Sequence, residues 1–274
     1  MTTQTPTMGE QHAAQSVIEE LLRHQSTTPK RTGFDRFFGR SPLGDDSVSC
    51  YLGAKGELAV GEILATLPPE WRAFHALPIG KKGADVDHVV IGPGGIFTLN
   101  TKNHRGQGVW VAGNTLMVSG RPVPHLRNAE HEADRVTKLL RERMPRLAAA
   151  QPVIALVDPK SLTIKKTPER VTVIASVGLR RWLLARPPVF GAAELAEVAA
   201  IIDDPATWPI SLFPPSEHPW AAFAALDAEV RQAHARSALW KLGGLGASVA
   251  AALMVVPTLL TILINAYLGG VDNP

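Results

Sequence analysis

The C-terminal stretch of the chain is the feature that most limits how it can fold. Residues 242–271 contain no charged side chain, and residues 249–268 are almost continuous Ala, Leu, Val, Ile and Met. A helix needs roughly 20 apolar residues to cross the hydrocarbon core of a bilayer, so the sequence predicts a transmembrane helix over 242–271. Pro257 lies inside this run, and a membrane helix tolerates proline better than an exposed soluble helix does. The alternative is a buried core helix, which usually carries more of a polar face.

The charges that flank this segment predict its orientation. Arg231, Arg236 and Lys241 precede it, and only Asp272 follows. Positive residues stay on the cytoplasmic side of a membrane. We therefore expect a single-pass protein whose main domain faces the cytoplasm. Residues 1–30 lack the apolar core of a signal peptide, which agrees with this route.

Length and composition limit the rest of the chain. With 274 residues there is room for one sizeable domain and appendages. The net charge of +3 neither requires nor excludes a nucleic-acid partner, because local patches matter more than the total. The only cysteine, Cys50, excludes an internal disulfide. The predicted segments are a weakly ordered N-terminal part (1–45), a globular domain (46–203), a linker with a juxtamembrane helix (204–241) and the transmembrane helix (242–271).

Residues 30–40 alternate basic and aromatic side chains. This composition is typical of a linker whose Phe residues pack on a domain, which is the interpretation we favour. It also suits a surface that holds phosphates and stacks bases, or one that contacts anionic lipid.

Hydrophobic periodicity and turn residues predict a mixed α/β domain. Gly92-Pro93-Gly94-Gly95 has the composition of a tight hairpin turn, because Gly supplies positive backbone angles and Pro fixes one corner. The helix expected over 128–143 mixes both charge signs, as a solvated face does, and we assign it no chemistry. The expected strands are 71–77, 86–91, 96–102, 109–111, 115–118, 153–157 and 171–175, and the other expected helices are 11–23, 54–67, 179–185, 192–202 and 220–240.

Polar side chains interrupt two strands that the hairpin turn joins. Asp87 lies on the first strand, and Asn100 and Lys102 share a face of the second. The hairpin brings these residues to the same end of the sheet. An acid, an oxygen ligand and a lysine suit phosphodiester hydrolysis, in which the acid holds a divalent cation and the lysine positions the attacking water.

These residues also carry a resemblance to a known family. Three segments occur in the order seen in nuclease-related (NERD) domains. They are Gly56-Glu57 in a helix, the run Ala84 to Phe97 with its Asp-His pair and Gly-Pro-Gly-Gly turn, and Asn100-Thr101-Lys102. The resemblance extends over about Leu52 to Leu140, a third of the chain. NERD domains are similar to the PD-(D/E)XK nucleases, so the resemblance implies a restriction-endonuclease-like fold, in which helices flank a mixed central sheet.

The resemblance also implies roles for individual residues. Asp87 matches the metal-binding acid, Lys102 the lysine of the motif, and Glu57 a helix carboxylate that assists the metal. The expected cofactor is Mg²⁺ or Mn²⁺, and the expected partner is DNA or RNA. Asn100 departs from the pattern, which has Glu or Asp at this position. An amide keeps an oxygen ligand but loses the charge that hard cations prefer.

The departure at Asn100 leaves two functions open. Glu57 and Asp87 compensate in a metal-dependent nuclease, or the groove binds nucleic acid or supports assembly at the membrane without cutting. In either case, a basic rim of Lys81, Lys82 and Arg105 would steer phosphates towards the site.

Three histidines lie near these residues in the sequence. His88 faces away from Asp87 along the strand, which favours a packed histidine over a ligand. His104 and His125 match no zinc spacing, and we expect them at the surface.

Overall fold

The computed structural model describes residues 7–80, 84–209 and 219–269. Its contacts divide the chain into two compact units, and each is described by itself. Unit 1 combines Met1–Ser26 with Asp45–Pro219, and unit 2 combines Thr27–Gly44 with Trp220–Pro274. Each unit is therefore built from two segments that are far apart in the sequence.

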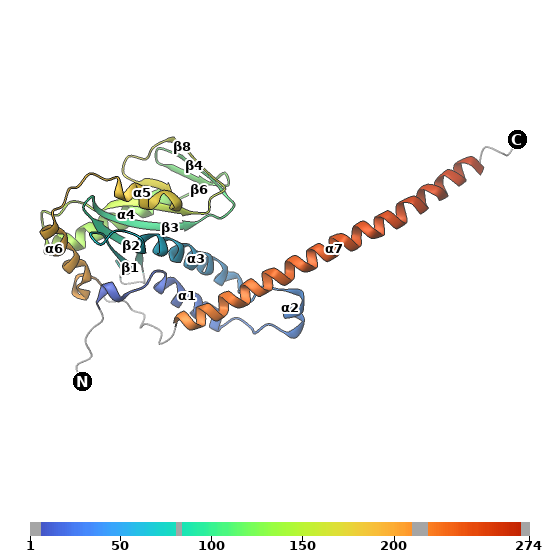
Figure 1. Ribbon diagram of the computed structural model, residues 1–274, viewed down its shortest axis with the longest axis horizontal. Coiled ribbons are helices and arrows are strands. Elements are labelled where there is room, and N and C mark those ends of the chain that lie inside the picture. The colour runs from blue at the N-terminus through green and yellow to red at the C-terminus, as the bar shows by residue number, and fades with distance from the viewer. Residues whose placement is uncertain (1–6, 81–83, 210–218, 270–274) are drawn as a thin grey trace. The chain divides into compact units, whose positions relative to one another are not determined.

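The centre of unit 1 is a five-stranded mixed sheet in the order β1-β2-β3-β7-β9 (Figure 1). The first three strands are antiparallel, while β3, β7 and β9 run parallel. Its strands are β1 (Arg72–Pro78), β2 (Asp85–Gly92), β3 (Gly95–Asn103), β7 (Gln151–Val157) and β9 (Thr172–Ala175). The predicted mixed sheet is confirmed.

The turn between β2 and β3 forms where its glycines predict it. Gly92 pairs with Gly95, whose φ of +131° is rarely adopted by residues that have a Cβ atom. A Cβ on Gly92 would overlap the indole ring of Trp71, which packs against Phe97 with ring centroids 6.2 Å apart. Glycine is thus required at both ends of this turn, by backbone angle at one and by packing at the other.

Helices cover both faces of the sheet. Alternate strand residues point to opposite sides, so Ile91 and Ile96 pack in one core cluster while Val90 and Phe97 pack in another. The first cluster includes residues of α4 and α6, and the second includes residues of α3 and α5. These helices are α3 (Asp45–Ala65), α4 (His125–Arg143), α5 (Ser176–Leu184) and α6 (Ala192–Asp203).

A second, four-stranded mixed sheet has the order β6-β5-β4-β8. The predicted hairpin of 109–118 forms β4 and β5, but its pairing with β6 and β8 was not expected. Its strands are β4 (Gly108–Ala112), β5 (Thr115–Val118), β6 (Arg121–Val123) and β8 (Ser161–Lys166). A third core cluster joins this sheet to α4 and to β7 and β9 of the larger sheet.

The N-terminal segment differs from the weakly ordered part expected over 1–45. It contains a 3₁₀ helix, η1 (Met8–Glu10), and the helices α1 (Gln15–Ser26) and α2 (Gly33–Phe38). Ile18 and Leu21 of α1 are fully buried, so this helix belongs to the core of unit 1. A second 3₁₀ helix, η2 (Pro205–Thr207), follows α6.

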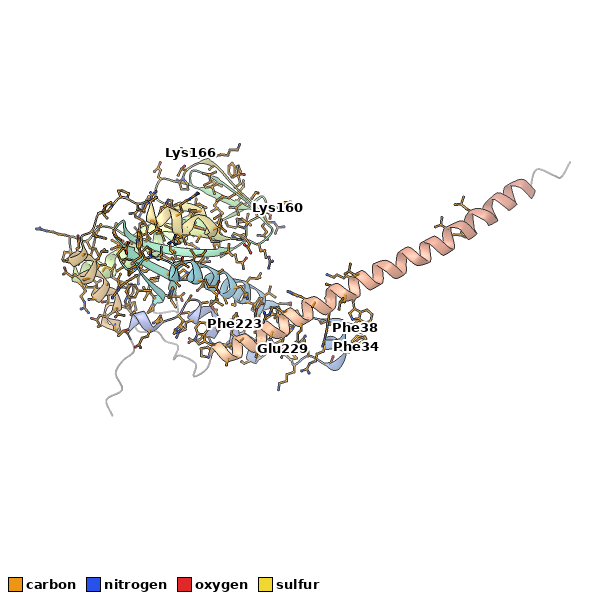
Figure 2. All side chains as sticks on the ribbon, in the orientation of Figure 1. Phe34, Phe38, Lys160, Lys166, Phe223 and Glu229 are labelled. Carbon is orange, nitrogen blue, oxygen red and sulfur yellow. The ribbon has the colours of Figure 1, made fainter. Side chains whose placement is uncertain are left out.

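Unit 2 consists of α2 and the long helix α7 (Pro219–Gly269). Figure 2 shows Phe34 and Phe38 together on α2, with ring centroids 4.4 Å apart. The ring centroids of Phe37 and Phe38 each lie 5.1 Å from that of Trp240 on α7. Arg31 forms an ion pair with Glu229, with 2.7 Å between Nη2 and Oε2. The aromatic side chains of 30–40 thus pack within the chain, although Phe34 and Phe37 stay largely exposed.

The predicted transmembrane segment, 242–271, falls mostly on the C-terminal half of α7. Most of its side chains, those of 244–255, 257–258 and 261–271, lie outside the described residues. Within what the structure describes, no helix has the length and apolar character required to cross a membrane.

Candidate active site

Asp87 is held by the backbone of the neighbouring strand. The regular pairing of β2 with β3 runs as far as His88 and Leu99. Beyond this point the backbone N–H of Thr101 donates a 2.6 Å hydrogen bond to Oδ2 of Asp87. The half-buried carboxylate is therefore fixed at the edge of the hairpin, where a second oxygen remains for another ligand.

Asn100 lies on β3 and faces helix α4. It is 4% exposed, and its Nδ2 donates to both carboxylate oxygens of Glu132, each at 2.7 Å. Asn100 Oδ1 is buried and has no hydrogen-bond partner within the described part of the chain. An acid from α4 therefore lies directly against the position where the nuclease pattern has its own acid.

Two further carboxylates interact with the charge of Asp87. Glu57 lies on α3 and accepts a hydrogen bond from the backbone N–H of Ala14, just before α1. Asp85, at the start of β2, accepts one from the side chain of Ser16. The N-terminal segment thus contacts both acids.

Mutual repulsion and burial set the ionisation of these acids. Burial, and then the charges of Asp87 and Asp85, raise the pKa of Glu57 well above its ordinary value. Burial raises the pKa of Asp85 to about 6, with the charge of Asp87 acting in the same direction. Burial raises the pKa of Glu132 to about 7, although the hydrogen bonds from Asn100 oppose the shift.

Lys102 is the cation that these acids share. Burial raises the pKa of Asp87, while the charge of Lys102 and the hydrogen bond from Thr101 act against that rise. The same ammonium group also lowers the pKa of Glu57 and of Glu132. Lys102 interacts with several carboxylates that repel one another, and an additional cation would reduce that repulsion.

The residue types suit a hard divalent ion, although no three of these carboxylates have oxygens within 4.8 Å of one another in the described part of the chain. Such ions take carboxylate and amide oxygens as ligands. Asp87, Glu57 and Glu132 supply carboxylates, and Asn100 supplies the buried Oδ1 that lacks a partner. The orphaned amide oxygen is the observation that favours a ligand at this point, because buried polar atoms are normally satisfied.

A cavity of about 600 Å³ opens beside these acids. Asp85 and Glu132 contribute to its wall, and Arg127, His131 and Arg135 of α4 contribute basic groups. The guanidinium of Arg135 donates to the carbonyl of Ile79 through Nε at 3.2 Å and Nη2 at 2.5 Å. The cavity is therefore lined by both acidic and basic side chains.

The structure does not place Arg105 at the cavity, and it does not describe Lys81 and Lys82, the other two residues of the expected basic rim. Arg105 is exposed in the turn after β3, where it forms an isolated bridge with Pro159, and it does not line the cavity. Lys81 and Lys82 lie outside the described residues. Among the described residues, Arg127, His131 and Arg135 are the basic groups at the cavity.

The histidines form two pairs. His88 is fully buried, and its Nδ1 lies 2.8 Å from Nδ1 of His75, so the expected packed histidine is confirmed. His104 and His125 stack with their Nε2 atoms 3.2 Å apart, and both are half-buried. Burial, with the charge of Lys102 acting in the same direction, lowers the pKa of His125 to about 4.

Sequence reasoning missed Glu132 and Asp85. The expectation that α4 has only a solvated charged face is wrong for Glu132, which binds the buried Asn100. One signal was present: Glu132 follows Ala129 and precedes Ala133 and Val136 at helical spacing, next to the apolar stripe. Asp85 shares a strand with Asp87 at the two-residue spacing of one face, which places a second acid nearby.

Comparison with known proteins adds an independent line of evidence. Neither the curated proteins nor the solved structures contain a match to this chain. Residues 52–157 match the model of the family described as nuclease-related domain, NERD, which supports the resemblance seen in the sequence for the segment that holds Glu57, Asp87, Asn100, Lys102 and Glu132.

Proposed function

We propose that this chain hydrolyses phosphodiester bonds of DNA or RNA with Mg²⁺ or Mn²⁺. The observation that carries the proposal is the geometry of two acids in the NERD-like segment, where the N–H of Thr101 holds Asp87 and the amide of Asn100 holds Glu132. A bound divalent ion would lower the pKa of a water molecule and offset negative charge on the phosphate. Asp87, Glu57, Glu132 and Oδ1 of Asn100 would hold that ion.

In this proposal Glu132 supplies the acid that position 100 lacks. Nδ2 of Asn100 holds both oxygens of Glu132 at 2.7 Å and so fixes the direction of the carboxylate. Each of those oxygens keeps a lone pair for another ligand. The charge missing from β3 is thereby restored from α4.

Lys102 and the arginines of α4 would act on the substrate. The ammonium of Lys102 orients the attacking water and balances charge that develops on the phosphate. Arg127 is exposed at the cavity, where its guanidinium can bind a neighbouring phosphate of the strand. Contacts of this kind carry no sequence information, so we expect cleavage with little sequence preference.

The test compares cleavage and binding in the same preparation. The full chain, purified in mild detergent, is incubated with end-labelled single- and double-stranded DNA and RNA in Mn²⁺ or in EDTA. We expect Mn²⁺-dependent cleavage that is lost in Lys102→Ala and in Glu132→Gln. The matched controls, Lys138→Ala and Glu142→Gln, change exposed residues of α4 and should cleave like the wild type.

A different outcome would favour the second candidate, a nucleic-acid-binding or assembly module. The observation behind this candidate is the neutral residue at position 100, with Glu132 already hydrogen-bonded to it. If the wild type retains nucleic acid on a filter but never cleaves it, while Asn100→Glu does cleave, the enzyme proposal is wrong and the binding module is supported.

We also propose that residues 242–271 anchor the chain in a membrane, with the domain facing the cytoplasm. The support is the uncharged run itself and the basic residues Arg231, Arg236 and Lys241 that precede it. The full chain should stay with membranes after an alkaline carbonate wash, and a chain ending at Lys241 should not. Release of the full chain by the wash would contradict a transmembrane anchor.

A further inference from the structure

A second group of ligand-bearing side chains lies on the seam between α1 and α3. Glu20 and His24 are one turn apart on α1, with Nε2 of His24 3.7 Å from Oε1 of Glu20. Cys50 lies on α3, and the ligand atoms of all three residues are within 4.8 Å of one another. Glu20 is exposed and the other two are half-buried, so solvent and ions reach the group.

The rest of the seam fixes how the two helices face each other. A Cβ on Gly61 would lie 2.6 Å from the methyl group of Ala13, and a Cβ on Gly53 would lie 3.5 Å from Val17. Ala13 lies just before α1 and Val17 lies on it, so the beginning of α1 and the residues before it pack against this face of α3. Cys50 continues the same face of α3 at a spacing of three residues from Gly53, so it is presented to Glu20 and His24.

The chemistry of this group differs from that of the oxygen-rich cluster around Asp87. A thiolate, an imidazole and a carboxylate form a mixed S, N and O set, which suits Zn²⁺ and not Mg²⁺. Ligand distances of roughly 2.0–2.3 Å in zinc sites put neighbouring ligand atoms within about 4 Å of each other. Small rotations of these accessible side chains are enough to reach that arrangement.

We propose that Glu20, His24 and Cys50 bind a transition-metal ion of the Zn²⁺ class, which clips α1 onto α3. Water would complete the coordination on the exposed side. The clip lies on the helix pair that also contains Glu57, whose carboxylate is bound by the N–H of Ala14. Binding here would therefore secure the N-terminal segment against the acids of the candidate active site.

The single cysteine makes a direct measurement feasible. The reduced, metal-free full chain is titrated with Co²⁺ as a spectroscopic substitute, and Zn²⁺ is then added. We expect a Co²⁺–thiolate absorption band that saturates at one equivalent and disappears on adding Zn²⁺. Zn²⁺ should also protect Cys50 from reaction with a thiol reagent. The variant His24→Ala should lose this protection, and the variant Cys50→Ser should lose the Co²⁺–thiolate band.

Two comparisons make the proposal falsifiable. Asp87→Asn should keep both the band and the protection, because it alters only the oxygen-rich cluster; loss of either in this variant would overturn the proposal. Absence of the band in the wild type, or full protection of Cys50 in His24→Ala, would overturn it as well. The thermal melts of His24→Ala and Cys50→Ser without metal should match the wild type, which separates ligand loss from misfolding.

Discussion

The contact between Asn100 and Glu132 explains how a site can lack an acid on its strand and still gather negative charge. The amide donates to a partly buried carboxylate that also interacts with the charges of Asp87, Asp85 and Lys102. Hydrogen bonding to the charged form favours ionisation, while burial opposes it. The residue at 100 therefore decides how easily Glu132 becomes a metal ligand.

Asn100→Asp should destabilise the folded chain when divalent cations are absent. The substitution replaces a donor with a carboxylate that points at both oxygens of Glu132, so an unpaired like-charge contact forms. We expect a loss of about 1–3 kcal/mol in the free energy of unfolding at pH 8 in EDTA, measured by urea denaturation. Mn²⁺ should restore most of it, because the ion neutralises the repulsion.

Asn114→Asp is the matched control for this change. Asn114 is exposed in the turn between β4 and β5 and does not line the cavity. Its variant should unfold like the wild type in EDTA. If Asn100→Asp is equally stable in EDTA, Glu132 does not carry the charge that we assign to it.

The raised pKa values of Glu132 and Asp85 predict how stability changes with pH. They titrate at about 7 and about 6 in the folded chain, against reference values of 4.5 and 3.8. The folded state holds these protons more tightly than the unfolded chain does. Their contribution is therefore complete below about pH 4 and is lost as the pH rises through 6 and then 7.

The measurement is the free energy of unfolding between pH 5 and 8 in EDTA. Glu132→Gln removes the group with the higher pKa, so its profile should fall less steeply than that of the wild type near pH 7. In the wild type, Mn²⁺ should raise stability more at pH 8 than at pH 5, because the ion competes with protons for the carboxylates. A Mn²⁺ effect that does not depend on pH would contradict binding by these acids.

Among the secondary-structure elements, the β2–β3 hairpin could be predicted from its turn residues, but the second sheet could not be predicted from the sequence. The turn of Gly92 to Gly95 needs no distant partner, and it formed as expected. Strand β8 has mostly exposed residues, so it shows no clear period of two, and it pairs in parallel with β4, about 50 residues earlier in the chain. Such pairings depend on tertiary contacts that single-sequence patterns do not contain.

The residues of the candidate site also divide into those that local sequence predicts and those that it does not. Asp87 and Lys102 come from neighbouring strands joined by a short turn, so sequence spacing could bring them together. The carboxylate of Glu132 reaches Asn100 only because α4 packs on β3, 32 positions further along the chain. The helical spacing places Glu132 beside the apolar stripe of α4, but it does not identify Asn100 as its partner.

Gly92→Ala should weaken the hairpin on which Asp87 depends. Its methyl group would overlap the ring of Trp71, which is 8% exposed and enclosed by packing. Overpacking of this kind costs about 1–3 kcal/mol, which urea denaturation can measure. Cleavage, if present, should fall with it, because β2 carries Asp87.

Gly33→Ala provides the comparison for that variant. Gly33 is the exposed first residue of α2, and a Cβ there would meet nothing within 4 Å. Alanine is the better helix former, so the expected change is neutral or stabilising by less than about 1 kcal/mol. If both alanine variants cost the same, crowding against Trp71 is not the cause.

For the molecule as a whole, contacts divide the chain differently from the sequence. The expected boundaries, 45/46 and 203/204, follow changes in composition. The contacts join residues up to Ser26 with the α/β core, and join Thr27–Gly44 with the C-terminal segment. Composition reports where the chain changes character but not which distant segments pack together.

Because unit 2 combines an N-terminal and a C-terminal segment, a single cut of the polypeptide between residues 209 and 219 should not release the C-terminal fragment from the rest of the chain. Residues 1–209 carry α2, whose Phe37 and Phe38 pack on Trp240 and whose neighbour Arg31 pairs with Glu229. Residues 1–209 and 219–274, produced as separate polypeptides in the same cell, should therefore co-purify in detergent through a tag on either fragment. Replacing both Phe37 and Phe38 by alanine should weaken that non-covalent complementation, because their ring contacts with Trp240 are lost. The ion pair and the hydrogen bonds that Arg236 and Trp240 donate to the backbone carbonyls of Arg36 and Phe37 would remain.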